Sequence, residues 1–148
     1  MVDDSPEFVD LAVHFLSVEP TIEIVGCASS GQAALELVAQ LCPDLVLMDV
    51  AMPEMNGLEA TRRIKARPGA PRVVILTLYD NPEYRAGAIA AGADGFIPKW
   101  ELGPSLLALI YGLFDAPPAQ RGGARPDTAY GGAQVPGSNR LDLACSGQ

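Results

Sequence analysis

The apolar positions of residues 1–116 follow two different periods. Behind a Ser5-Pro6 start signal, apolar side chains from Phe8 to Leu16 recur every three or four residues, which is typical of an amphipathic helix. Residues 45–48 and 73–76 are instead uninterrupted apolar runs, which predict strands buried on both faces. The other predicted elements alternate in the same way: a strand at 22–28, a helix around 34–41, a helix at 57–67, a helix at 82–91, a strand at 95–97 and a helix at 104–114.

Strands that alternate with helices of this length predict right-handed crossovers and a parallel sheet covered on both faces. We therefore expect an α/β fold with a doubly wound, five-stranded parallel sheet of the flavodoxin-like kind. A strand usually has about five residues, whereas only Met1 and Val2 precede the first acidic pair. The first strand is therefore expected to be truncated at the N-terminus.

The composition changes after residue 116. Six of the 15 glycines and four of the 13 prolines fall in residues 117–148, where large apolar residues are few. Such a segment buries too little apolar surface to offset the entropy of ordering. We predict a folded domain at 1–116 and a disordered Gly/Pro-rich tail at 117–148.

Charge and cysteine content exclude several classes of protein. The chain has 18 acidic and 10 basic residues and a net charge of −8, so it repels nucleic acid. No apolar stretch approaches the roughly 18 residues that a membrane span needs. Three cysteines and a single histidine indicate neither a disulfide framework nor a zinc site. The first residues lack the features of a signal peptide, and a cytoplasmic location is expected.

Polar side chains stand where the predicted strands end. Asp3 and Asp4 follow the first strand, Asp49 and Thr77 end two buried strands, and Lys99 follows the last strand. Ligands gather at this edge of a parallel sheet. Crowded carboxylates repel one another and need a hard cation such as Mg²⁺ to be ionised together. The set suits phosphoryl transfer to a carboxylate, with Asp49 as nucleophile and with Lys99 and Thr77 contacting the phosphoryl oxygens.

The motifs that carry these residues are specific. Residues 45–57, Leu-Val-Leu-Met-Asp-Val-Ala-Met-Pro-Glu-Met-Asn-Gly, resemble the phosphoacceptor strand and loop of the receiver domain of bacterial two-component response regulators. Val2–Ser5 is similar to that family's acidic metal-binding pair, 74–77 to its strand with the switch hydroxyl, and 91–99 to its fifth strand and phosphate-contacting lysine. The resemblance covers about 1–114. It is strongest to receivers that often precede a helix-turn-helix domain.

The resemblance implies a function and a set of site residues. Asp49 would accept a phosphoryl group in phosphorelay signal transduction, and Asp4, Asp49 and the Ala51 carbonyl would bind Mg²⁺ directly, with Asp3 acting through water. Thr77 and Phe96 would be the switch residues. The implied partners are a sensor histidine kinase or a phosphotransfer protein, and a downstream protein that binds the surface of the fourth helix, fifth strand and fifth helix. The protein is not expected to be an enzyme.

Three departures from the family pattern leave alternatives open. The short first strand means that either the start is misplaced or the receiver is weakened. Trp100 stands where many relatives carry a proline, and no helix-turn-helix follows, so direct DNA binding is not expected. One alternative is a receiver-like interaction module that is not phosphorylated, and another is a fragment of a DNA-binding transcriptional regulator. A haloacid-dehalogenase-type phosphatase needs a second acid two residues after the nucleophile, where this chain has Ala51.

Overall fold

Helices and strands alternate along the chain as the apolar pattern predicts. The computed structural model describes residues 1–115 and 141–144. The helices are α1 (Pro6–Ser17), α2 (Gly31–Leu41), α3 (Gly57–Lys65), α4 (Pro82–Ala91) and α5 (Pro104–Phe114), with a short 3₁₀ helix at Lys99–Glu101. The strands are β1 (Ile22–Gly26), β2 (Leu45–Asp49), β3 (Arg72–Thr77), β4 (Gly95–Pro98) and β5 (Leu141–Ala144).

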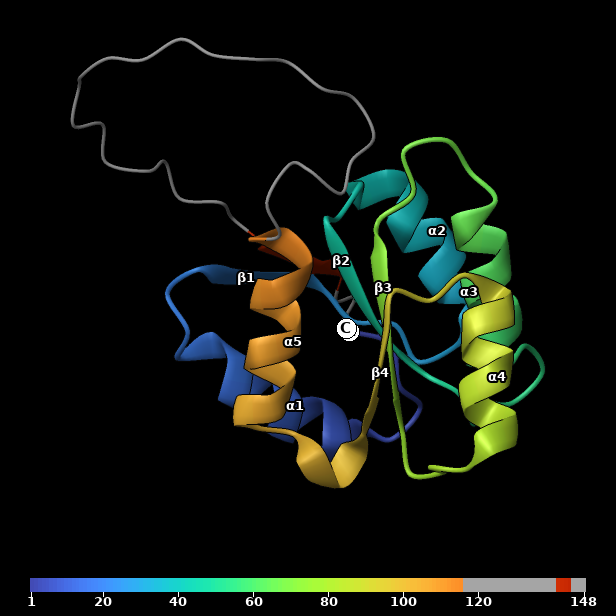
Figure 1. Cartoon of the computed structure of the whole chain (residues 1–148). Coiled ribbons are helices and arrows are strands. Elements are labelled where there is room, and N and C mark those ends of the chain that lie inside the picture. The colour runs from blue at the N-terminus through green and yellow to red at the C-terminus, as the bar shows by residue number, and fades with distance from the viewer. Residues whose placement is uncertain (116–140, 145–148) are drawn as a thin grey trace, which may run out of the picture.

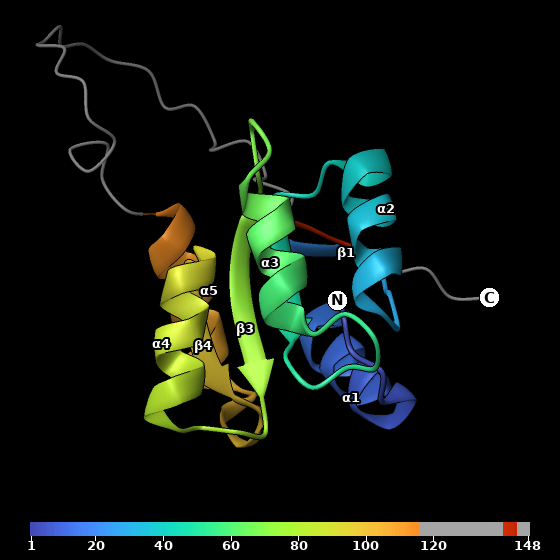
Figure 2. The ribbon, with the colours of Figure 1, turned by 90° about the vertical axis from the view of Figure 1, so that its right-hand side faces the viewer.

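The strands form one parallel sheet in the order β1-β5-β2-β3-β4. Helices α1 and α5 cover one face of this sheet, and α2, α3 and α4 cover the other (Figure 1). Figure 2 views the second of these layers, with α3 in front of the sheet. The α/β, doubly wound parallel architecture predicted from the sequence is thus confirmed.

The two faces of the central strands build separate halves of the core. In β2, Leu45 and Leu47 pack with α1 and α5, whereas Val46 and Met48 pack with α2 and α3. Because successive side chains of a strand point to opposite faces, a strand that is apolar at every position supplies both halves. All five residues of β2 are buried, so Asp49 at its end is held in a fixed place.

Helix starts follow local capping chemistry. The side chains of Ser5, Ser30, Asn56 and Asn81 each accept a hydrogen bond from a backbone N–H of the first turn of the helix that follows. Such caps satisfy donors that have no partner inside the helix. Helix α3 ends at Lys65, two residues before the predicted end at 67.

The N-terminal segment lies inside the sheet as a very short strand. Val2 forms isolated parallel bridges to Ala28 and to Met48. The Val2 N–H donates to the Leu47 carbonyl at 2.8 Å, and the Asp49 N–H donates to the Val2 carbonyl at 2.9 Å. Two neighbours therefore hold Val2 directly before the acidic pair.

The fifth strand differs from the expected one. Residues 141–144 lie between β1 and β2, in register with Ile22–Gly26 on one side and paired through Leu143 with Leu45 on the other. This strand falls within the tail predicted at 117–148, and the other residues of that tail lie outside the described part of the chain. The local pattern did not predict this pairing, because residues 141–144 follow a Gly/Pro-rich segment with few large apolar residues.

Two further predictions concern membrane-spanning helices and disulfide bonds. Within the described ranges, none of the helices has the length and apolar character needed to cross a bilayer. Cys27 is buried just after β1 and is disulfide-bonded, which the cysteine pattern did not predict, whereas Cys42 is an exposed free thiol.

Candidate functional site

The carboxyl ends of the strands bring the predicted site residues together. Asp49 and Thr77 are the last residues of β2 and β3, and Lys99 follows β4 directly. Asp3 and Asp4 follow Val2, which pairs with β2. Parallel strands end at the same edge of a sheet, so side chains that are up to 96 residues apart in sequence share one site.

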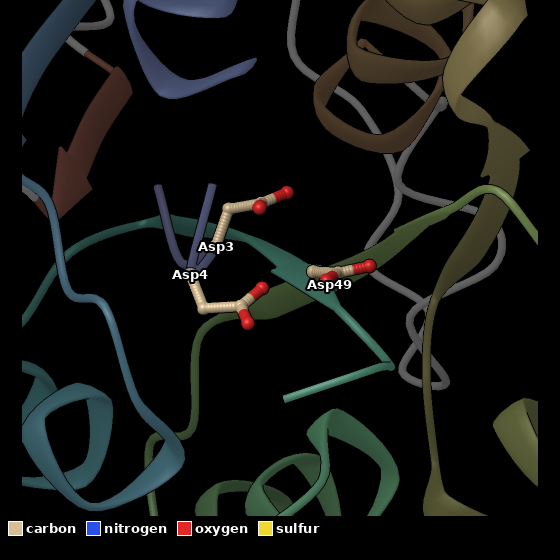
Figure 3. A group of neighbouring side chains, drawn as sticks. All are labelled: Asp3, Asp4 and Asp49. Carbon is tan, nitrogen blue, oxygen red and sulfur yellow. The ribbon is translucent and has the colours of Figure 1, made fainter. Parts of the chain in front are cut away.

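Three carboxylates cluster at this edge. Asp3, Asp4 and Asp49 each offer an oxygen, and these oxygens lie within 4.8 Å of one another. Figure 3 shows the first two extending from the N-terminal segment and Asp49 from the end of its strand. Asp3 and Asp49 are buried, at 2% and 3% exposure, and Asp4 is exposed. The cluster is therefore open to solvent on the Asp4 side only.

Lys99 supplies the positive charge of the site. Its Nζ lies 2.6 Å from Asp3 Oδ2 and 3.5 Å from Asp49 Oδ1, and its side chain is 8% exposed. The same ammonium stands 4.4 Å from the centre of the Phe8 ring, a cation–π contact that α1 contributes. One ammonium faces three carboxylates, so the site keeps an excess of negative charge.

Burial and the neighbouring carboxylate both affect the pKa of Asp49. Burial, together with the nearby charge of Asp3, raises the pKa of Asp49 to about 6, although the Lys99 ammonium and the Val50 N–H act in the opposite direction. A carboxyl group with a raised pKa is one whose ionised form lacks compensation. A further cation beside Asp49 would supply it.

The acidic cluster fits a hard divalent cation. Asp3 Oδ1 accepts a hydrogen bond from the Ser5 N–H at 2.9 Å. Asp3 Oδ2 is the single buried side-chain oxygen in the described residues with no hydrogen bond of acceptable geometry, despite its ion pair with Lys99. Buried polar atoms are nearly always satisfied, and carboxylate oxygens are the ligands that Mg²⁺ prefers. The donor set of the cluster therefore suits such an ion.

Thr77 places a hydroxyl at the end of β3, the strand that pairs with β2. The residue is fully buried at the end of β3, and its Oγ1 accepts a hydrogen bond from the Tyr79 N–H at 3.1 Å. A hydroxyl that accepts in this way still has its own proton to donate. Thr77 is therefore able to donate to a new anionic oxygen at the site.

The loop after Asp49 is held closely against the end of β2. The Gly57 N–H donates to the Val50 carbonyl at 2.9 Å. A Cβ atom on Gly57 would lie 1.7 Å from the Asp49 carbonyl oxygen and 2.7 Å from the Asp49 carbonyl carbon. No side chain fits at this position, which explains why the loop after β2 returns through glycine. Ala51 is exposed two residues beyond Asp49 and carries no carboxyl group.

The predicted switch aromatic lies on β4, on the side facing α4. Phe96 is half-buried, and the Arg85 guanidinium carbon lies 4.6 Å from its ring centre. The sequence interpretation identified neither this contact nor that of Phe8 with Lys99. Phe8 matches the helical apolar period and was assigned to packing, and nothing local to it points to a partner 91 residues away.

The sequence is similar to known proteins over most of its length. A family model described as the response regulator receiver domain matches residues 1–111. A protein-glutamate methylesterase/protein-glutamine glutaminase of Nocardioides sp. is 45% identical over 101 residues, which are 67% of this chain and 28% of that protein. The nitrate/nitrite response regulator protein NarL of Escherichia coli K12 is 35% identical over 99 residues, 67% of this chain and 46% of NarL. The chain thus matches less than half the length of these curated relatives.

Solved structures are similar in fold. The signal receiver domain of the putative response regulator NarL from Mycobacterium tuberculosis is 32% identical, with a TM-score of 0.68 over 75% of this chain and 93% of that one. The response regulator domain of Thermotoga maritima CheB is 28% identical, with a TM-score of 0.69 over 79% of this chain and 95% of that one. The family match, the fold and the clustered acids at the strand ends agree, and this chain belongs to the response regulator receiver domain family.

Proposed function

We propose that the protein is a phosphorelay receiver that accepts a phosphoryl group on Asp49 and changes a partner-binding surface in response. The observation that carries this proposal is the buried Asp3–Lys99–Asp49 arrangement, with Lys99 Nζ 2.6 Å from one carboxylate and 3.5 Å from the other. A buried ammonium between two acids is costly to assemble for structure alone. The Lys99 ammonium suits a site that receives a doubly charged anion.

The proposed reaction is an in-line displacement at phosphorus. A carboxylate oxygen of Asp49 forms a bond to the phosphorus of a donor, and the bond from phosphorus to the donor's leaving atom breaks, with its electron pair passing to that atom. The product is an aspartyl phosphate. Lys99 neutralises one of the phosphoryl oxygens, and Thr77 donates a hydrogen bond to another.

Asp4, Asp49 and the Ala51 carbonyl are the proposed direct ligands of Mg²⁺, with Asp3 acting through water. When bound, the ion neutralises charge that builds up on the phosphoryl oxygens. Lys99 Nζ lies 3.5 Å from Asp49 Oδ1, within reach of a phosphoryl group on that carboxylate. The absence of a carboxyl group at Ala51 supports a long-lived phosphoprotein over a phosphatase, because no acid–base residue stands at the position that would activate water.

Uptake of phosphate from a small phosphodonor such as acetyl phosphate, with and without Mg²⁺, tests the proposal. Mg²⁺-dependent incorporation of one phosphate per chain, labile to hydroxylamine, is the expected result. No incorporation would favour the alternative of a receiver-like interaction module that is not phosphorylated. Continuous release of phosphate with turnover would favour an enzyme.

Mg²⁺ is expected to stabilise the fold. At ten times its dissociation constant it should raise the free energy of unfolding by about 1.4 kcal/mol, which corresponds to a rise of several degrees in melting temperature. Asp4→Ala should remove most of this effect. Asp10→Ala, which deletes an exposed acid on α1 outside the cluster, should keep it. An equal melting temperature with and without Mg²⁺ in the starting protein would contradict the site.

The effect of Mg²⁺ should depend on pH in a defined direction. The pKa of Asp49 is raised to about 6, so without metal the folded state holds a proton between about pH 4 and 6 that the unfolded state has released. Asp49 therefore makes the metal-free protein less stable as pH rises through this window. Mg²⁺ requires the ionised form, so its stabilising effect should be full at pH 7 and decline as pH falls below 6.

We further propose that Thr77 and Phe96 couple phosphorylation to the surface formed by α4, β4 and α5. Donation from the Thr77 hydroxyl to a phosphoryl oxygen would move it toward Asp49, and the space it leaves would admit the Phe96 ring. Such a ligand shifts the population of two states by its differential contacts.

Thr77→Ala should separate the two events. Labelling of Asp49 should persist, because the nucleophile and Lys99 remain, while the amide resonances of residues 78–102 should no longer shift when beryllofluoride and Mg²⁺ are added. Thr77→Ser keeps the hydroxyl and should retain the shifts. If Thr77→Ala responds as the starting protein does, the hydroxyl is not the coupling group.

The partners proposed for this receiver are a sensor histidine kinase or a phosphotransfer protein as donor, and a downstream protein on the α4-β4-α5 surface. The curated relatives are longer proteins, and one of them, DegU of Brevibacillus brevis, is a transcriptional regulatory protein. A place within a longer DNA-binding regulator is therefore the second candidate. Direct binding of nucleic acid by residues 1–116 is not proposed, because the chain is acidic overall.

A further inference from the structure

The face of the Phe96 ring on the α4 side is occupied by an arginine. The guanidinium carbon of Arg85, from α4, lies 4.6 Å from the ring centre on β4. The two residues, with Ile89, border a hollow of about 220 Å³ between α4 and β4. A guanidinium over an aromatic face is an attractive cation–π contact. Phe96 is therefore restrained on the face that Arg85 covers.

The guanidinium is itself anchored. Arg85 Nε donates to Asp80 Oδ1 at 2.5 Å and a terminal nitrogen donates to Asp80 Oδ2 at 2.9 Å. This bidentate geometry fixes the plane of the guanidinium. Its edge binds Asp80 while its face covers Phe96, so one side chain links the β3–α4 loop to β4.

The anchor lies in the same short turn as the switch hydroxyl. Asp80 is three residues after Thr77, and the Tyr79 N–H between them donates to Thr77 Oγ1 at 3.1 Å. A movement of Thr77 toward Asp49 would therefore pull on the turn that holds Asp80. Releasing Asp80 would in turn release the guanidinium from the ring.

We propose that Arg85, anchored by Asp80, is a positioning residue that holds Phe96 in its unphosphorylated position and so sets the resting balance of the switch. This inference rests on the proposed phosphorylation of Asp49. Removing a partly exposed cation–π contact should favour the switched state by about two- to fivefold. Removing the anchor while keeping Arg85 should give a shift in the same direction.

The first arm of the experiment uses the metal-free protein and does not depend on phosphorylation. The side-chain protons of Arg85 should resonate upfield of their usual position because of the Phe96 ring current. In Asp80→Asn this shift should shrink, since the guanidinium is no longer held over the ring. Usual Arg85 shifts in the starting protein would overturn the proposal.

The second arm titrates beryllofluoride at saturating Mg²⁺ and follows the amide resonances of β4. The half-saturating concentration should fall about two- to fivefold in Arg85→Ala and in Asp80→Asn. The matched control is Arg63→Ala, which removes an equally exposed arginine from an ion pair with Glu59 on α3. It should leave the midpoint unchanged. Equal midpoints in Arg85→Ala and the starting protein would also overturn the proposal.

The two failures can be told apart. If the starting protein shows no response to beryllofluoride, the proposed phosphoacceptor function fails, and the first arm alone decides whether Arg85 restrains Phe96. If the response is present but insensitive to Arg85 and Asp80, the receiver function stands and the restraint is wrong.

Discussion

Asp49→Asn should abolish phosphate incorporation, with labelling at least about 100-fold below that of the starting protein. The amide keeps the shape of the side chain but has no anionic oxygen to attack phosphorus. Folding should be preserved. The substitution also removes one of three crowded carboxylates, so the metal-free variant should be at least as stable at pH 7, because the carboxylate whose pKa is raised to about 6 no longer has to be ionised. The measurements are hydroxylamine-labile labelling and chemical denaturation.

The control for this variant lies at the other end of the same strand. Asp44 is exposed directly before β2, and Asp44→Asn removes the same charge without touching the cluster. Its labelling should equal that of the starting protein. Undiminished labelling of Asp49→Asn would place the phosphorylation site elsewhere and contradict the mechanism.

The second large effect is expected from Gly57→Ala. The added Cβ would stand 1.7 Å from the Asp49 carbonyl oxygen and 3.0 Å from Met48 Cγ. The first of these contacts is with backbone, so no rotamer change relieves it, and the end of β2 or the start of α3 must move. We expect a loss of about 3 kcal/mol in the free energy of unfolding, at the upper end of what overpacking costs. The displaced Asp49 should also be labelled much more slowly.

Gly112→Ala separates this effect from the general one of glycine in a helix. Nothing lies within 4 Å of a Cβ atom at Gly112 in α5, and alanine is the better helix former by up to about 1 kcal/mol. This variant should be unchanged or slightly more stable, with normal labelling. If Gly57→Ala matched Gly112→Ala in both the free energy of unfolding and the rate of labelling, the inferred close approach of the loop to Asp49 would be wrong.

Much of the site follows from local sequence. The apolar runs before Asp49 and Thr77 specify buried parallel strands, because only such strands are apolar on both faces. Parallel strands end together, so the polar residues after them must meet at one edge. The position of each polar residue relative to its strand was therefore enough to predict that they share one edge of the sheet. These residues are Asp3, Asp49, Thr77 and Lys99.

Contacts made by side chains across elements were not predictable in this way. The cation–π contact of Phe8 with Lys99 joins α1 to a residue 91 positions later, and that of Arg85 with Phe96 joins the packed side chains of α4 and β4. Phe8 and Arg85 fit the patterns of an ordinary core position and an ordinary exposed helix position. Which groups face each other depends on how the helices rotate against the sheet, and that is decided by the packing of the whole core.

The strands of the sheet also differ in whether the sequence predicts them. Periodicity and capping are local properties, so four of the five strands, the helices between them and the edge where the acids gather follow from the sequence. The place of residues 141–144 between β1 and β2 depends instead on the assembled sheet. A strand is recruited there by the unpaired backbone groups of its two neighbours, not by a pattern of its own, because buried N–H and C=O groups require partners.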